Sequence, residues 1–141
     1  MAVVIGVDTN VFVGACLGVG ASNAVVASCL RGVHRPLMGA ALLAEYEDVL
    51  GRRRLFERSR LTAAERDELF EIFLAQCLWT HIYFGWRPNL RDEADNHVVE
   101  LAVAGDASHI VTRNAADFVR MELRFPVAIR TPELFLKETR K

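Results

Sequence analysis

Val3-Val4-Ile5-Gly6-Val7, followed by Asp8-Thr9-Asn10, is the stretch that decides the predicted fold. Five nearly continuous apolar residues are typical of a parallel strand that is buried on both faces. An acid follows where the strand ends, and in an open α/β sheet ligands bind at the carboxyl ends of the strands. Asp8 is therefore a candidate functional residue, although an aspartate at this place can also tighten a turn through its side-chain oxygen.

The size and composition of the chain indicate one globular domain over residues 1–141. Hydrophobic residues make up 52% and charged residues 25%, which suits a single core. The net charge is −1, from 17 Lys and Arg against 18 Asp and Glu. This balance argues against a general nucleic-acid coat protein but is compatible with a local basic groove.

The cysteines and the N-terminal residues predict a cytoplasmic protein. Cys16, Cys29 and Cys77 are far apart and show no zinc-site spacing, so we expect reduced thiols. The chain starts with a strand and lacks the pattern of a signal peptide. No apolar run approaches the roughly 18 residues that a membrane span needs, so we expect no membrane association.

Turn residues and hydrophobic periodicity predict strands that alternate with helices. The expected strands are 3–7, 35–39, 79–84, 109–112 and an edge strand at 126–129. The expected helices cover 23–31 with Ser22 as N-cap, 40–53, the segment from the capping box Thr62-Ala63-Ala64-Glu65 to Cys77, 98–104, and a last helix that starts at 131–133. This order is the α/β pattern of a mainly parallel sheet with helices on both faces.

Acidic residues occur at places that this alternation brings to one edge of the sheet. They are Asp8, Glu45, Asp92 with Asp95, and Asp117, which follows Asn114. Carboxylates a few ångströms apart repel each other unless a cation lies between them, and oxygen ligands favour Mg²⁺ or Mn²⁺ over zinc. Such a site can cleave phosphodiesters. The alternative is that the acids are unrelated, with Asp95 as a helix cap, Asp117 as a turn former and Glu45 as a surface charge.

One basic run follows the helix that carries Glu45. Arg52-Arg53-Arg54, Arg58 and Arg60 place five arginines in nine positions. The run is either a solvated helix end that the helix dipole favours or a rim that contacts the phosphates of a nucleic acid.

Three blocks of this sequence resemble a PIN domain. They are Val-Asp-Thr-Asn at 7–10, Glu45 within Leu-Leu-Ala-Glu-Tyr-Glu-Asp-Val-Leu at 42–50, and the long segment 92–118. The chain is similar to stand-alone prokaryotic PIN proteins of the VapC type, which are classed as toxins of toxin–antitoxin systems. The resemblance implies a three-layer α/β/α sandwich with four or five mainly parallel strands and a Mg²⁺- or Mn²⁺-dependent ribonuclease.

The resemblance also assigns the metal ligands. It maps the first acid of the family onto Asp8 and the helical glutamate onto Glu45. The third acid maps onto Asp95, with Asp92 as the alternative, because Asn96 stands where many relatives carry aspartate.

The fourth acid and the supporting residues come from the segment after 108. Asn114 stands where the family often has an acid, so Asp117 is the candidate for the fourth ligand. Thr112 resembles the hydroxyl residue of the family beside the metal. Thr9 and Asn10 are expected to brace Asp8 by hydrogen bonds.

The family context predicts partners as well. Toxins of this type are usually homodimers, and each is held by a small antitoxin protein; the substrate is RNA. The alternative function is a non-catalytic or weakly catalytic PIN-fold module that binds RNA or protein, which Asn96 and Asn114 favour. We expect His97 to be a histidine on the helix surface, and the alternative is a proton donor.

Overall fold

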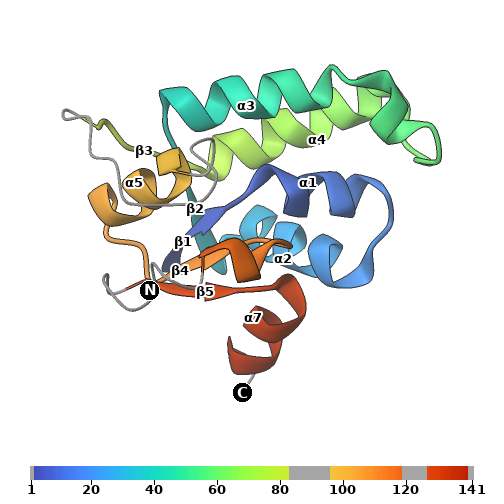
Figure 1. The fold of residues 1–141 in the computed structure, drawn as a ribbon. Coiled ribbons are helices and arrows are strands. Elements are labelled where there is room, and N and C mark those ends of the chain that lie inside the picture. Colours follow the sequence, from blue (N-terminus) through green and yellow to red (C-terminus); the bar gives the residue numbers. More distant parts are fainter. Residues whose placement is uncertain (1, 83–95, 119–126, 140–141) are drawn as a thin grey trace.

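Five parallel strands form one sheet in this computed structural model, which describes residues 2–82, 96–118 and 127–139 (Figure 1). The strand order is β3-β2-β1-β4-β5, so β1 lies in the middle. The strands are β1 Val3–Val7, β2 His34–Met38, β3 Leu78–Trp79, β4 His109–Val111 and β5 Ala128–Arg130. The predicted parallel α/β sheet and its edge strand near the C-terminus are therefore confirmed.

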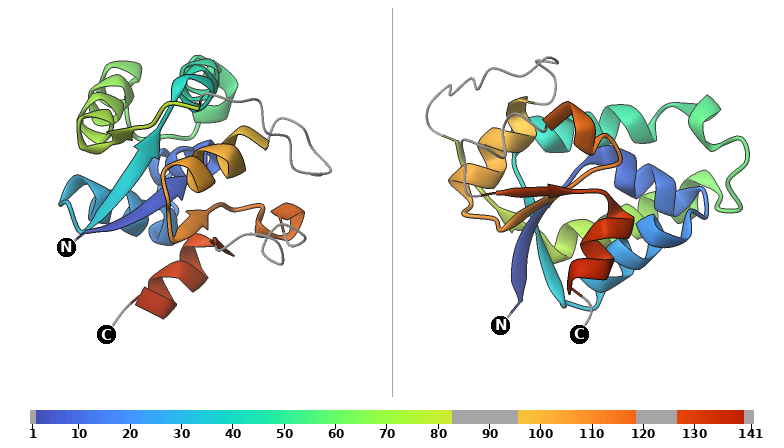
Figure 2. Two further views of the ribbon diagram at one scale, coloured as in Figure 1. Left: turned by 90° about the vertical axis from the view of Figure 1, so that its left-hand side faces the viewer. Right: turned by 60° about the horizontal axis from the view of Figure 1, so that its bottom comes forward.

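Helices cover both faces of this sheet, as the two views in Figure 2 show. The helices are α1 Thr9–Cys16, α2 Gly20–Leu30, α3 Ala40–Leu50, α4 Ala63–Gln76, α5 Asn96–Ala104 and α7 Pro132–Thr139, with short 3-10 helices η1 Arg53–Phe56 and η3 Ala115–Phe118. Neighbouring strand residues point to opposite faces. A Cβ at Gly6 would lie 4.0 Å from Cβ of Ala102, so this face of β1 meets α5.

An aromatic cluster on the other side of β1 fixes α3 against the sheet. The cluster joins α1, α3 and α4 through Phe12, Tyr46, Phe70 and Phe73, whose ring centroids lie 5.2 to 6.4 Å apart. The hydroxyl of Tyr46 also donates a hydrogen bond of 2.8 Å to the main-chain oxygen of Val7. Because Val7 ends β1, this bond places α3 beside the carboxyl end of the central strand.

The start of the chain differs from the prediction. The apolar residues after Asp8 form α1, and α2 begins at Gly20 with Val19 as N-cap, so Ser22 is not a cap. Ser22 is buried inside α2, where its Oγ would lie 2.6 Å from a Cβ at Gly14. The close approach of α1 and α2 at this glycine therefore sets their positions. Within the described ranges, no single helix is long and apolar enough to cross a membrane, and α1 with α2 reaches that length only across a bend of 107°.

Two further boundaries are corrected, and one is confirmed. β3 ends at Trp79 instead of extending over 79–84, although Thr80 still donates to the main-chain oxygen of Met38 at 2.8 Å. The helix expected over 40–53 ends at Leu50, so the first arginines of the basic run follow it in and beside η1. The capping box at Thr62 and Glu65 is formed in both directions.

Candidate functional site

Asp8 is placed by the junction of β1 and α1. It is the N-cap of α1, and its Oδ1 accepts a hydrogen bond of 2.8 Å from the main-chain N–H of Thr9. Asp8 is only 3% exposed. A helix N-terminus favours negative charge, so the local fold partly stabilises a carboxylate that is otherwise cut off from water.

Side chains from the first turn of α1 and from the residue after β4 hold the second oxygen of this carboxylate. The hydroxyl of Thr112, which is fully buried, donates to Oδ2 of Asp8 at 2.9 Å. Nδ2 of Asn10 lies 3.4 Å from the same oxygen and donates to the Thr112 hydroxyl at 3.2 Å. The main-chain N–H groups of Arg113 and Asn114 donate to Asn10 Oδ1 and to Thr112 Oγ1 at 2.9 and 3.1 Å. The ends of the two strands are thus joined through one carboxylate.

Glu45 enters the site from α3 and meets His97 from α5. Nε2 of His97 lies 3.3 Å from Oε2 of Glu45, and their side chains are 18% and 28% exposed. Among the described residues, this Glu45 oxygen is enclosed yet accepts no hydrogen bond. The expectation of a surface histidine at His97 is therefore wrong, because α5 packs beside α3 and turns the imidazole toward the acid.

The charge of Glu45 affects the pKa of Asp8. Burial raises the pKa of Asp8 above its ordinary value, the hydrogen bond from Thr112 opposes this, and the negative charge of Glu45 raises it again. A charged His97 would act in the opposite direction on the same pKa. Negative charge is thus gathered here at a cost that a bound cation would offset.

The donors present fit a hard divalent cation, although the described set is incomplete. Asp8 and Glu45 offer carboxylate oxygens, the ligands that Mg²⁺ and Mn²⁺ prefer, and one Glu45 oxygen lacks a donor. In the residues that the structure describes, no three His, Cys, Asp or Glu side chains are arranged to hold an ion. Asp92 and Asp95, the candidates for a third ligand, lie outside the described residues, as does the side chain of Asn96.

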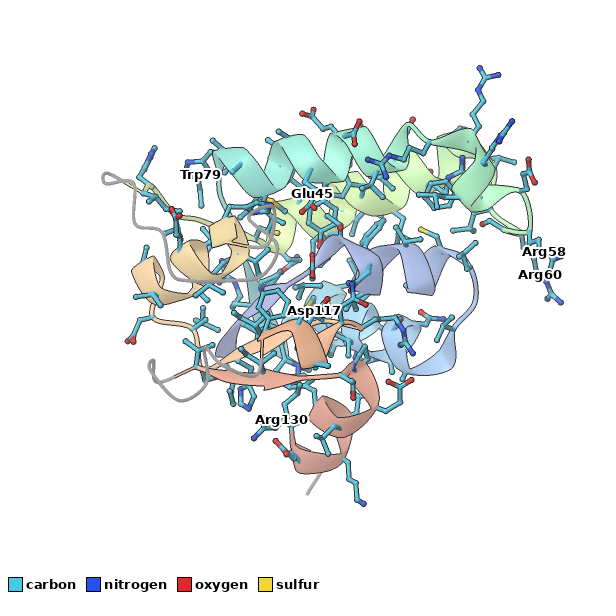
Figure 3. All side chains as sticks on the ribbon, viewed as in Figure 1. Glu45, Arg58, Arg60, Trp79, Asp117 and Arg130 are labelled. Atoms are coloured by element: carbon cyan, nitrogen blue, oxygen red, sulfur yellow. The ribbon has the colours of Figure 1, made fainter. Side chains whose placement is uncertain are left out.

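The candidates after β4 have different surroundings. Asp117 is exposed on η3, and its main-chain N–H donates to the main-chain oxygen of Asn114 at 2.9 Å. In the view of Figure 3, Glu45 lies above the start of α1 and Asp117 lies below it. The side chain of Asn114 is exposed as well, while its N–H reaches Thr112. The Thr112 hydroxyl, which accepts from the Asn114 N–H and donates to Asp8, therefore connects Asn114 to Asp8.

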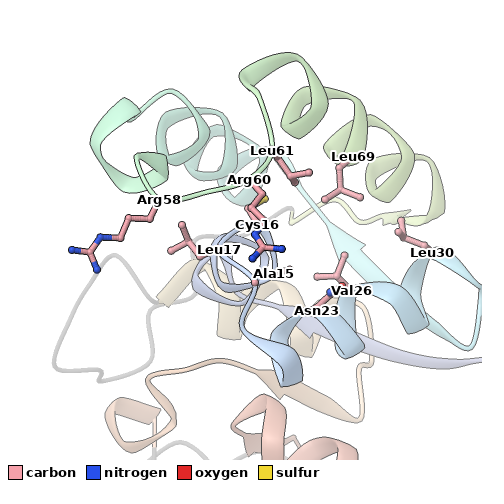
Figure 4. A pocket seen from close by; sticks show the side chains of 11 residues that line it. Ala15, Cys16, Leu17, Asn23, Val26, Leu30, Arg58, Arg60, Leu61 and Leu69 are labelled. Atoms are coloured by element: carbon pink, nitrogen blue, oxygen red, sulfur yellow. The ribbon is translucent and has the colours of Figure 1, made fainter.

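The arginine run lies at the far end of α3. Arg52, Arg53 and Arg54 are exposed, and Arg52 pairs with Asp48 on the preceding turn. Arg58 and Arg60 border a separate cavity of about 600 Å³ between α1, α2 and α4 (Figure 4). The rest of its lining is mostly apolar and includes no acid, so this cavity is distinct from the Asp8 site.

Sequence analysis missed the part that Arg113 plays in the site. Its guanidinium donates to Ser22 Oγ and to Glu133, both at 3.1 Å, while its N–H holds Asn10. These bonds connect the loop after β4 with α2 and with the start of α7. The sequence signal that could have identified Arg113 is its position directly after a strand, between Thr112 and Asn114.

Comparison with known proteins supports the fold. A family model described as PIN domain matches residues 3–116. The structure is similar to the crystal structure of VapBC2 from Rickettsia felis bound to a DNA fragment from their promoter, with a TM-score of 0.57 and 14% identity over 91% of this chain and 98% of that chain. At this identity the likeness shows the fold alone. No curated protein matches the chain.

Proposed function

Since the chain belongs to the PIN domain family, we propose that it is a Mg²⁺- or Mn²⁺-dependent endoribonuclease and the toxin of a toxin–antitoxin pair. One observation carries the proposal. A buried carboxylate at the end of the central strand shares its surroundings with Glu45, and Oε2 of Glu45 accepts no hydrogen bond among the described residues. This arrangement is unfavourable without a cation, so it suits a cation-binding site better than a set of independent helix caps.

The proposed ligands are Asp8 and Glu45 with Asp95, or Asp92 in its place, and Asp117. A divalent ion held there would lower the pKa of a bound water and stabilise the leaving oxygen of a phosphodiester. In this site the residues around Asp8 would hold this ligand in position. The Thr112 hydroxyl donates to Asp8, which favours the ionised form of the buried carboxylate and fixes its direction.

Substrate binding is proposed for the basic run. Arg52, Arg53 and Arg54 follow the helix that carries Glu45, and all three are exposed. The helix from Glu45 to its end at Leu50 rises about 8 Å, and Arg52 follows two residues later, which places it within the reach of one or two nucleotides from Glu45. Contacts from arginine to phosphate position a strand without reading its sequence.

Cleavage of a mixed RNA pool tests the function directly. Wild type, Asp8→Asn and Glu45→Gln are compared with Mg²⁺, with Mn²⁺ and with EDTA, and Glu47→Gln serves as control because Glu47 is exposed on another face of α3. We expect both site variants to lose more than about 100-fold in rate, since even outer residues of metal sites cost 10- to 100-fold. Full Mg²⁺-dependent cleavage by Asp8→Asn would refute the assignment.

A module that binds RNA or protein without cleavage is the second candidate. It is favoured by Asn96 and Asn114, which are amides at positions where the family often has acids. It predicts no heat of Mn²⁺ binding in calorimetry. A tight Mn²⁺ isotherm that Glu45→Gln abolishes would exclude it.

We propose a small antitoxin and a second copy of the chain as partners in the cytoplasm. The similar VapBC2 structure contains a complex bound to DNA. The apolar cavity beside Arg58 and Arg60 offers a partner segment an apolar floor with positive charge at its edge. Light scattering after size-exclusion chromatography tests the homodimer, because a mass near 15.8 kDa would contradict it.

A further inference from the structure

We propose that His97 belongs to the cation site and supplies a nitrogen donor beside Glu45, so that the site favours Mn²⁺ over Mg²⁺. The inference rests on the proposed function, since it concerns the same site. Its first support is position. Nε2 of His97 lies 3.3 Å from the Glu45 oxygen that accepts no hydrogen bond among the described residues.

The surroundings of the imidazole support a role inside the site. The His97 side chain is 18% exposed, and it comes from α5, whereas Glu45 comes from α3 and Asp8 from the end of β1. Both Glu45 and His97 act electrostatically on Asp8. His97 and Glu45 therefore meet from two different helices, within electrostatic range of Asp8.

The chemistry of the donors gives the direction of the effect. Mg²⁺ is a hard cation that prefers oxygen ligands and keeps several waters, whereas imidazole nitrogen suits later first-row metals. Among the described residues, no three His, Cys, Asp or Glu side chains are arranged to hold an ion, so His97 and Glu45 supply two of the donors and not a complete set. An ion would replace the direct contact between His97 and Glu45 with a contact from each of them. An imidazole in the site thus raises the affinity for Mn²⁺ more than that for Mg²⁺.

Pulsed electron paramagnetic resonance of bound Mn²⁺ tests this without any cleavage assay. Wild type should show ¹⁴N modulation that His97→Ala loses and that ¹⁵N-histidine labelling alters. His97→Gln, which keeps most of the side-chain volume, guards against a folding defect and should lose the modulation too. His81→Ala is the matched control, because His81 is exposed after β3.

Calorimetry supplies the second readout. The ratio of Mn²⁺ to Mg²⁺ affinity should fall about 10-fold or more in both His97 variants, the lower range seen for residues that support metal sites. Mn²⁺ bound to wild type without ¹⁴N modulation, and with the same ratio in His97→Ala, would overturn this inference and leave the proposed function standing. Absence of any Mn²⁺ binding by wild type would overturn both.

Discussion

Thr112→Val tests whether the bond between β1 and β4 at Asp8 holds the site together. Valine keeps the shape of threonine, so the change removes a hydroxyl without opening a cavity. That hydroxyl donates to Oδ2 of Asp8 at 2.9 Å, and it is completely buried, so water cannot take its place.

The size of the effect follows from the charge of the acceptor. A hydrogen bond to a charged group contributes about 1.5–3 kcal/mol, whereas a neutral one contributes about 1 kcal/mol. The Asn10 amide and the Asn114 main-chain N–H that donate to Thr112 are only part-buried, so water can accept from them instead. We therefore expect Thr112→Val to lower the free energy of unfolding by about 2 kcal/mol.

Urea unfolding in EDTA at pH 7.5 measures this, and a double-mutant cycle isolates the bond. In the Asp8→Asn background the acceptor is neutral, so Thr112→Val should cost only about 1 kcal/mol. Thr139→Val is the matched control, since its hydroxyl donates to a neutral main-chain oxygen at the less buried end of α7. An equal cost in both backgrounds would refute the view that the bond serves the Asp8 charge.

Three further predictions concern the frame around the site. Gly14→Ala should destabilise the protein by about 1–3 kcal/mol in urea, because the new Cβ would lie 2.6 Å from Ser22 Oγ. Tyr46→Phe should cost about 1 kcal/mol through loss of the bond to the end of β1. Burial lowers the pKa of His34 and of His109 below the ordinary value of 6.5, so the unfolded chain binds their protons first. Stability should therefore be complete well above pH 6.5 and fall as the pH decreases through and below 6.5 in urea titrations.

Each of these predictions has its own control. Gly20→Ala has open space around the new Cβ and should not destabilise, so equal losses at both glycines would contradict the packing argument. Tyr46→Leu separates the lost bond from lost ring packing. Replacement of both histidines by glutamine should flatten the pH dependence, and an unchanged slope would assign it to other groups. Glu138 and Arg130 act on His109 in opposite directions, so they only adjust its pKa.

Local signals predicted most of the fold. The apolar run of β1 and the capping box at Thr62 depend on neighbours in sequence, and both are confirmed. The apolar residues after Asp8 look the same in a strand and in a helix, and the capping hydrogen bond at Asp8 makes them α1. The start of α2 depends on how closely Gly14 lets two helices approach, which periodicity does not report.

The site was predictable where residues follow strands and unpredictable where helices meet. Asp8, Asn10 and Thr112 lie at strand ends, and their contact follows from β1 and β4 being neighbours. The pairing of His97 with Glu45 depends on the angle at which α5 lies beside α3, and the sequence carries no signal for that angle. The roles of Asp95 and Asp117 as ligands remain predictions.

The place of β1 in the middle of the sheet has a consequence for synthesis on the ribosome. Asp8 leaves the ribosome near the start of translation, but the hydroxyl that fixes it comes 104 residues later. β1 likewise lacks its neighbouring strand β4 on one side until β4 has been synthesised. Contacts this distant in sequence form late in folding. A nascent chain therefore carries an incomplete Asp8 site until most of the chain has been synthesised.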